Sequence, residues 1–217
     1  MDNSEKSALP IKRAPQQQRA LDRIDAILAA TEVVVAEGGY EDLTMVKIAA
    51  RAGITHSSIY HYFSSVEAIL AELISRLMAE FDRSTADILA RAQTPEALIE
   101  AALQTIELGF QTYRSTPVIR GLWAATRYLP TLRKIDDEDT ARNARLFSDR
   151  FMALAPDTDE NAIYVSMRMA ATLCVPAYEA ALSLPVSLHN QAINDFLAMV
   201  HSRLYAVVVM PSSKQGE

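Results

Sequence analysis

The segment at residues 44–63, TMVKIAARAGITHSSIYHYF, restricts the fold more than any other part of the sequence. Thr44 is a suitable N-cap for a short helix that has one apolar face. Gly53 permits a sharp turn after that helix, and Thr55 then caps a second short helix, which we expect to reach about Phe63. Two short helices joined by a turn that contains glycine fit a helix-turn-helix unit.

The rest of the chain also has the periodicity of helices. Apolar residues recur at intervals of three and four, and only 6 of 217 residues are glycine, which favours helices over strands and turns. Proline, glycine and capping residues separate the helices, which we expect at about 17–37, 44–52, 55–63, 65–93, 94–115, 117–128, 130–155, 157–184 and 188–209. The sequence therefore predicts an all-α protein of about nine helices.

Two of these helices are expected to begin with a capping box. In this motif the N-cap side chain bonds a backbone N–H three residues on, and an acidic side chain at that position bonds back. The segments at 64–67 and 157–160 have this pattern, with Glu67 and Glu160 as the returning acids.

Composition changes suggest how the chain is divided. Residues 1–16 are polar and contain two prolines, which predicts a disordered arm, and residues 211–217 form a similar tail. Between them we expect a three-helix helix-turn-helix domain at 17–65 and a larger helical domain at 66–210.

Several classes of protein are unlikely from the residue types present. The single cysteine, Cys174, excludes an internal disulfide framework, and no apolar run is long enough to cross a membrane. The chain starts without the pattern of a signal peptide, so we expect a soluble cytoplasmic protein without membrane contact. There is no Gly-rich phosphate loop, no nucleophile elbow and no metal-ligand cluster, so we expect no enzyme, cofactor or metal. The acidic run at 136–139 is interpreted as solvated surface.

Charge gives only weak support for a nucleic-acid partner. The net charge is −6, although residues 1–23 hold five basic and three acidic side chains. Any affinity for DNA must then come from the placement of individual groups and not from a broad basic field.

The helix-turn-helix segment resembles the DNA-binding domain of the tetracycline-repressor (TetR) family. The matching features are an opening threonine, an Ile-Ala pair, an Ala-Gly turn and a Tyr-x-Tyr-Phe ending, which are Thr44, Ile48-Ala49, Ala52-Gly53 and Tyr60-His61-Tyr62-Phe63. The similarity covers about residues 17–74, and the remainder matches in length and helical character. Val66 stands where the family often has a phosphate-binding lysine, which would remove one backbone contact.

The resemblance implies a DNA-contacting role for ten residues. Phosphates would be bound by Thr44, Tyr60 and His61, and the major groove would be faced by Thr55, His56, Ser57 and Ser58. Lys12, Arg13 and Arg19 would reach the minor groove or flanking phosphates, although the first two also fit a solvated tail. Phe63 is expected in the core, and Tyr62 fits either role.

The resemblance also implies a small-molecule pocket in the larger domain. Its expected walls are Phe110, Tyr113, Trp123, Arg127, Tyr128, Phe147, Met167, Cys174 and Tyr178. Aromatic residues and methionines suit an apolar pocket, but helical spacing alone would place each of them in an ordinary core, and Arg127 also fits the surface.

The last two helices are expected to pair with a second copy of the chain. The expected interface residues are Val165, Leu173, Ala177, Val200, Leu204, Val207 and Val208. Together these features imply a homodimer that binds a palindromic operator in double-stranded DNA, acts as a repressor, and releases the operator on binding a small molecule. Two other classes stay open: a helical enzyme, and a helical carrier or adaptor that has lost DNA binding.

Overall fold

The computed structural model describes residues 15–210, which fold into nine α-helices and two short 3-10 helices without any strand. The helices are α1 (Pro15–Gly38), α2 (Met45–Arg51), α3 (His56–Ile59), α4 (Val66–Arg91), α5 (Pro95–Ser115), α6 (Pro117–Thr126), α7 (Pro130–Leu154), α8 (Glu160–Leu182) and α9 (His189–Val208), with η1 at Tyr40–Asp42 and η2 at Val186–Leu188. The prediction of an all-α protein with about nine helices is confirmed. Helix α1 begins at Pro15, so the last two residues of the predicted arm at 1–16 are helical. The rest of the arm, with Lys12 and Arg13, and the predicted tail at 211–217 lie outside the described residues.

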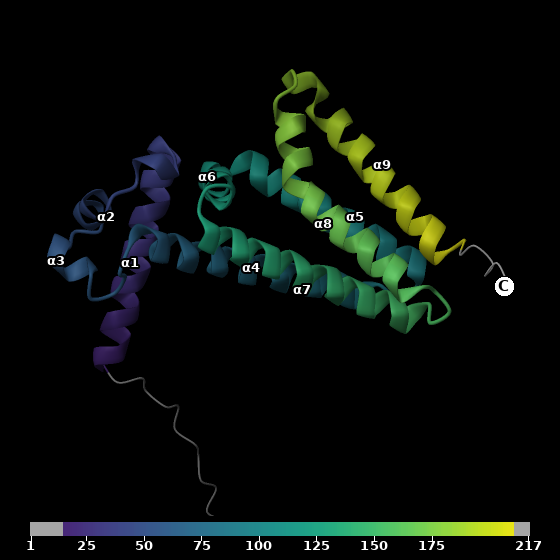
Figure 1. Ribbon diagram of the computed structural model, residues 1–217, viewed down its shortest axis with the longest axis horizontal. Coiled ribbons are helices and arrows are strands. Elements are labelled where there is room, and N and C mark those ends of the chain that lie inside the picture. The colour runs from purple at the N-terminus through teal and green to yellow at the C-terminus, as the bar shows by residue number, and fades with distance from the viewer. Residues whose placement is uncertain (1–14, 211–217) are drawn as a thin grey trace, which may run out of the picture.

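The helices form a small cluster at one end and a larger bundle beside it (Figure 1). Helices α1, α2 and α3 make the cluster, and α4 leaves it to run alongside α7 across the molecule. Helices α5, α8 and α9 pack against one another further away, while α6 lies next to α1. Within this described part of the chain, no helix is both long enough and apolar enough to cross a membrane.

The core of the N-terminal cluster extends past the predicted boundary at residue 65. Its centre holds Ile27, Ile48 and Ile59, all fully buried, and the first half of α4 joins them. Leu122 and Ala125 of α6 pack into the same core, as does the start of α7. The two predicted domains therefore share helices, because α4 and α6 complete a core that α1 to α3 do not close alone.

Side-chain caps define the starts of five helices. Thr44 and Thr55 cap α2 and α3 as predicted, since each accepts a hydrogen bond from a backbone N–H three residues on. The two predicted capping boxes do not form, because the caps lie further along the chain and the residues three positions after them are Ala68 and Ala162, which have no acidic side chain. Ser65, one residue after the predicted cap, accepts from the Ala68 N–H at 3.1 Å, and Asp159, two residues after the other, accepts from two backbone N–H groups.

The second predicted helix of the motif is shorter than expected. Helix α3 ends at Ile59, and the backbone N–H groups of Tyr62 and Phe63 both donate to the Ile59 carbonyl in a tight turn. This turn brings the Phe63 ring into the core, which confirms its expected burial, and leaves Tyr62 half-buried.

Four of the seven predicted interface residues lie inside the chain's own core. Val200, Leu204, Val207 and Val208 are at most 8% exposed, because this face of α9 packs on α5 and α8. Their placement at a dimer interface is wrong. The periodic apolar stripe was correctly identified, but an apolar stripe does not specify whether its partner helix belongs to the same chain.

Candidate functional site

The helix-turn-helix unit is held by a glycine turn and a buried pair of isoleucines. Gly53 has a φ of 64°, a left-handed conformation that residues with a Cβ rarely adopt, and the next amide donates to the Ala49 carbonyl at 3.0 Å. Ile48 of α2 and Ile59 of α3 are both fully buried in the core beneath. This packing fixes the exposed side of α3 relative to α2.

The predicted groove-facing residues lie together on the exposed side of α3. The Thr55 hydroxyl shares hydrogen bonds with the hydroxyls of Ser58 at 2.7 Å and Ser57 at 3.1 Å. The rings of His56 and Tyr60 meet edge to face, with their centroids 5.2 Å apart. Thr44 and His61 are exposed nearby in the sequence, and Arg19 is exposed on α1.

The two cations of α2, Lys47 and Arg51, already have acidic partners. The Lys47 ammonium lies 3.4 Å from the Asp42 carboxylate, and the Arg51 guanidinium donates to Glu37 at 2.9 Å. The exposed side of α3 therefore presents hydroxyl, imidazole and phenol groups, which bond to phosphates and base edges without a net charge.

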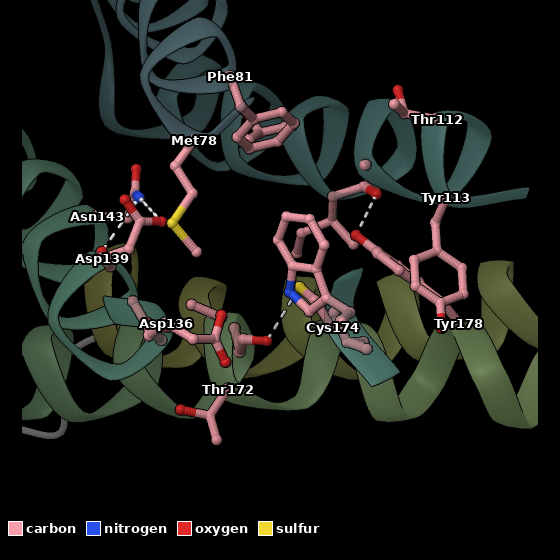
Figure 2. A pocket seen from close by; sticks show the side chains of 18 of the residues that line it. Met78, Phe81, Thr112, Tyr113, Asp136, Asp139, Asn143, Thr172, Cys174 and Tyr178 are labelled. Atoms are coloured by element: carbon pink, nitrogen blue, oxygen red, sulfur yellow. Dashed lines mark hydrogen bonds between the residues drawn. The ribbon is translucent and has the colours of Figure 1, made fainter. Parts of the chain in front are cut away.

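The larger bundle encloses a cavity of about 700 Å³ between α4, α5, α6, α7 and α8 (Figure 2). Seven of the nine predicted pocket residues line it, namely Tyr113, Trp123, Arg127, Phe147, Met167, Cys174 and Tyr178. They come from four different helices, so only the folded bundle brings them together.

The other two predicted pocket residues lie elsewhere. Phe110 is fully buried in the core, where its ring packs on Tyr178 from behind the cavity wall. Tyr128 is 69% exposed, and its ring stacks on Tyr40 of η1 with the centroids 6.1 Å apart. Tyr128 follows the end of α6, where the chain turns toward the N-terminal cluster. Its aromatic side chain therefore did not indicate a place in the cavity wall.

Sequence reasoning missed the polar part of the cavity wall. Three of the four acids at 136–139 line the cavity, where we expected solvated surface, and Asn143 joins them. A signal was present, because residues 136, 140, 143 and 147 are spaced by three and four and therefore share one face of α7. The α4 side chains Leu77, Met78 and Phe81 also line the cavity and were not singled out.

Two of the cavity acids, Asp136 and Asp139, are destabilised in their ionised form. Burial raises the pKa of Asp136, the Asp137 carboxylate raises it further, and a contact with the Trp123 indole offsets part of the rise. Burial, with a smaller effect of Asp82, raises the pKa of Asp139 to about 6. Asp139 is held by the Asn143 amide, which donates to it at 3.1 Å, and by an ion pair with Arg142.

A second set of polar side chains, which hydrogen-bond to one another, lies at another part of the cavity wall. Arg127 forms an ion pair with Glu179, and the Tyr113 hydroxyl donates to the same carboxylate at 3.0 Å. Burial raises the pKa of Tyr113, and so does this hydrogen bond. The Tyr178 hydroxyl donates to the Ile106 carbonyl at 2.7 Å, and Gly109 leaves room for it, since a Cβ there would lie 2.6 Å from that oxygen.

Helix α6 stands between the cavity and the N-terminal cluster. One side of α6 contributes Ile119, Trp123 and Thr126 to the cavity wall. Its other side approaches α1 so closely that a Cβ on Gly121 would lie 2.5 Å from a methyl group of Val35. Helix α6 therefore contacts both regions directly.

Two family models match the chain. The model for bacterial regulatory proteins of the tetR family matches residues 27–73, and that for the tetracyclin repressor-like C-terminal domain matches residues 96–208. The chain is also similar to the HTH-type transcriptional regulator BetI of Agrobacterium fabrum, with 29% identity over 63% of this chain and 60% of that protein. It is 38% identical to the fatty acid metabolism regulator protein of Bacillus subtilis over 33% of this chain and 38% of that protein. The matches thus span less than two thirds of either relative.

Solved structures share the fold at low sequence identity. A TetR transcription regulator from Haloarcula marismortui superposes with a TM-score of 0.68 and 17% identity, covering 87% of this chain and 99% of that chain. RolR in complex with resorcinol gives a TM-score of 0.65 and 14% identity, covering 92% and 98%. The relatives are named as regulators, which confirms the expectation that the chain is not an enzyme. Because the C-terminal family model alone spans more than half of the sequence, the chain belongs to the tetracycline-repressor (TetR) family of bacterial regulatory proteins.

Proposed function

We propose that the chain is a cytoplasmic, ligand-responsive repressor that binds a palindromic operator as a homodimer and releases it when a small molecule fills the cavity. The observation that carries this proposal is the double role of α6, which is at once a wall of the cavity and a part of the N-terminal core. A change in the shape of the cavity then acts directly on the helices that hold the DNA-contacting surface.

The DNA contacts would depend more on the positions of individual polar side chains than on the net charge of the surface. Phosphates would be bound by Thr44, Tyr60 and His61. Base edges would be contacted by His56 and by the hydroxyls of Thr55, Ser57 and Ser58. Hydroxyls and imidazoles bond phosphate oxygens, and serine and threonine pair with several base edges. Arg19, exposed on α1, would bind a flanking phosphate, and Lys12 and Arg13 would extend this contact.

The dimer would form through the exposed faces of α8 and α9. Val165, Met169 and Leu173 repeat every fourth residue along α8 and are 55%, 52% and 42% exposed. Met199 of α9 is 65% exposed, and α9 packs beside α8. A second copy of the chain is the natural occupant, because an isologous pairing of this face gives the two-fold symmetry that a palindromic site requires. Val165, Leu173 and the half-buried Ala177 stay in this proposed interface.

Release would follow from unequal binding to two arrangements of the bundle. A ligand shifts such an equilibrium only as far as its affinities for the two arrangements differ. Helix α4 contributes Leu77 and Met78 to both the cavity wall and the N-terminal core, so α4 and α6 would together transmit the change.

Fluorescence anisotropy tests DNA binding directly. The protein is titrated onto a labelled duplex from its own upstream region and onto a scrambled duplex, each at two salt concentrations. We expect tight binding to the native duplex that saturates at an even number of chains. Tyr60→Phe should weaken that binding, because it removes a phosphate-binding hydroxyl, whereas Tyr128→Phe should leave it unchanged, because Tyr128 is 69% exposed and lies outside both the motif and the proposed dimer interface. Equal, weak and strongly salt-dependent binding to both duplexes would favour the carrier or adaptor instead.

Light scattering after size exclusion tests the dimer. Met169→Glu places a charge on the proposed interface, so we expect the mass to fall from two chains to one. Leu146→Glu is the control, since Leu146 is 42% exposed on α7, a helix that is not part of the proposed interface. A dimer that survives Met169→Glu and dissociates with Leu146→Glu would place the interface elsewhere.

A further inference from the structure

We propose that the cavity binds an organic cation that carries an aromatic group, with its ammonium centre between the Asp136 carboxylate and the Trp123 indole. The inference rests on the proposed sensing role of the cavity and names the chemical class of its ligand. It depends on which charges line the cavity and which of them already have partners in the protein.

The cavity wall carries more acids than bases. Four carboxylates line it, from Glu80, Asp136, Asp137 and Asp139, against two guanidinium groups. Arg127 pairs with Glu179, whereas Arg133 is exposed and donates to the Arg127 backbone carbonyl. An anionic ligand at Arg127 would have to displace Glu179, and anywhere in the cavity it would meet more carboxylates than guanidinium groups.

Among the described residues, two of these carboxylates, Glu80 and Asp136, have no ion-pair partner, and of the two only Asp136 is half-buried, since Glu80 is exposed. Asp137 lies 3.6 Å from the Arg168 guanidinium, and Asp139 pairs with Arg142. Over residues 15–210 no lysine, arginine or histidine nitrogen comes within ion-pair distance of Asp136. The pKa of Asp136 is raised because burial and the neighbouring Asp137 carboxylate, which disfavour its ionised form, outweigh the opposite effects of Trp123 and of the more distant Arg168 cation. A bound cation would relieve that cost.

The aromatic side chains complete the arrangement. Trp123 and Asp136 both line the cavity, and an indole is the best natural partner for a cation, so one cation in the cavity can meet both the carboxylate and the indole. Figure 2 shows Met78, Asp136 and Asp139 at one end of the cavity and Tyr113 and Tyr178 at the other. A ligand with a charged end and an aromatic end matches this division.

Two probes of similar shape and opposite charge test the proposal. Benzyltrimethylammonium and phenylmethanesulfonate both join a phenylmethyl group to a tetrahedral charged centre. Trp123 is the single tryptophan of the chain, so its fluorescence reports occupancy of the cavity without a label. We expect saturable quenching by the cation with an affinity at least about tenfold above that of the sulfonate.

Single substitutions then test which carboxylate binds the cation. Asp136→Asn should lower the affinity for the cation about tenfold and leave that for the sulfonate unchanged or higher. Asp149→Asn, an exposed acid on the same helix outside the cavity, is the matched control and should change neither. Equal affinities for the two probes, tighter binding of the sulfonate, no effect of Asp136→Asn, or no quenching by either probe at millimolar concentrations would overturn the proposal. Native-duplex binding in the anisotropy experiment would still stand in each of those cases, so a wrong ligand class is distinguished from a wrong function.

Discussion

The two ends of the molecule are built on opposite packing principles. The N-terminal cluster is filled, with Ile27, Ile48 and Ile59 fully buried and threonine caps at both motif helices. The larger bundle is hollow, with a cavity of about 700 Å³ walled by aromatic, sulfur and acidic side chains. A filled core keeps one arrangement, whereas a cavity leaves room for alternative side-chain positions. This difference agrees with the proposed function, in which the N-terminal cluster presents a rigid DNA-contacting surface and the bundle holds an adjustable ligand site.

The same truncation should therefore cost very different amounts in the two regions. Leu122→Ala removes a fully buried side chain from the filled core, and we expect a loss of about 2–5 kcal/mol in the free energy of unfolding. Leu77→Ala truncates a half-buried side chain that already borders empty space, and about 1 kcal/mol is expected. Urea unfolding measures both. Equal losses would contradict the contrast between a filled and a hollow region.

The contact between the two regions should be intolerant of added volume. Gly121→Ala places a Cβ against the Val35 methyl group, and we expect a loss of about 1–3 kcal/mol from overpacking. Val35→Ala in the same chain should recover most of that loss, because the clash is with that methyl group. Thermal unfolding of the single and double variants gives the coupling, and strict additivity would show that the helices do not meet here.

Two equivalent helix caps separate stability from DNA binding. Thr44 of α2 and Thr94 of α5 each accept one backbone hydrogen bond at 3.1 Å. Replacing either by alanine should cost about 1 kcal/mol of stability. Only Thr44→Ala should also weaken native-duplex binding in the anisotropy assay, because only that hydroxyl faces DNA in the proposed complex. Equal DNA affinities for the two variants would remove Thr44 from the contact surface.

The smallest expected effect is a pH dependence that comes from the cavity wall. The pKa of Asp139 in the folded protein, about 6, lies above the ordinary value, so its ionisation destabilises the fold. This cost is absent below about pH 4, grows as the pH rises to 6, and persists above.

Removing the charge should remove that dependence. Asp139→Asn should therefore gain stability relative to the natural chain between pH 4 and pH 6, by less than about 1 kcal/mol once solvent screening is included. Urea unfolding at several pH values, with the exposed Asp149→Asn as control, measures it. A relative loss over this window would reverse the assigned direction.

Local sequence patterns predicted the motif and the helices well. Threonine caps, the glycine turn and apolar periodicity act within a few residues, so Thr44, Gly53 and Thr55 could be assigned from the sequence alone. The sequence could not predict features that depend on which element packs against a given helix face. The apolar stripe that includes Leu204 was correctly identified, but its partner is the same chain and not a second copy.

The lining of the cavity could be predicted only in part, because it too depends on how the helices pack. Aromatic residues such as Trp123 and Tyr113 were singled out by type, and the bundle does bring them to one wall. Asp136 was assigned to the surface because buried carboxylates are rare, and only the packing of α7 against α4 and α8 encloses it. Tyr128 shows the converse, since a large aromatic side chain can lie exposed on a link between two regions.

The emission of Trp123 during a titration with the native duplex tests the coupling of the two regions most directly. Trp123 is the single tryptophan, lies on the helix between the regions, and lines the cavity, so no ligand has to be known. Coupling is reciprocal, so DNA bound at the N-terminal cluster must act back on the cavity. We expect the emission to shift with the native duplex, in step with anisotropy, and to stay constant with the scrambled one. Saturating, sequence-specific binding with unchanged Trp123 emission would contradict the account.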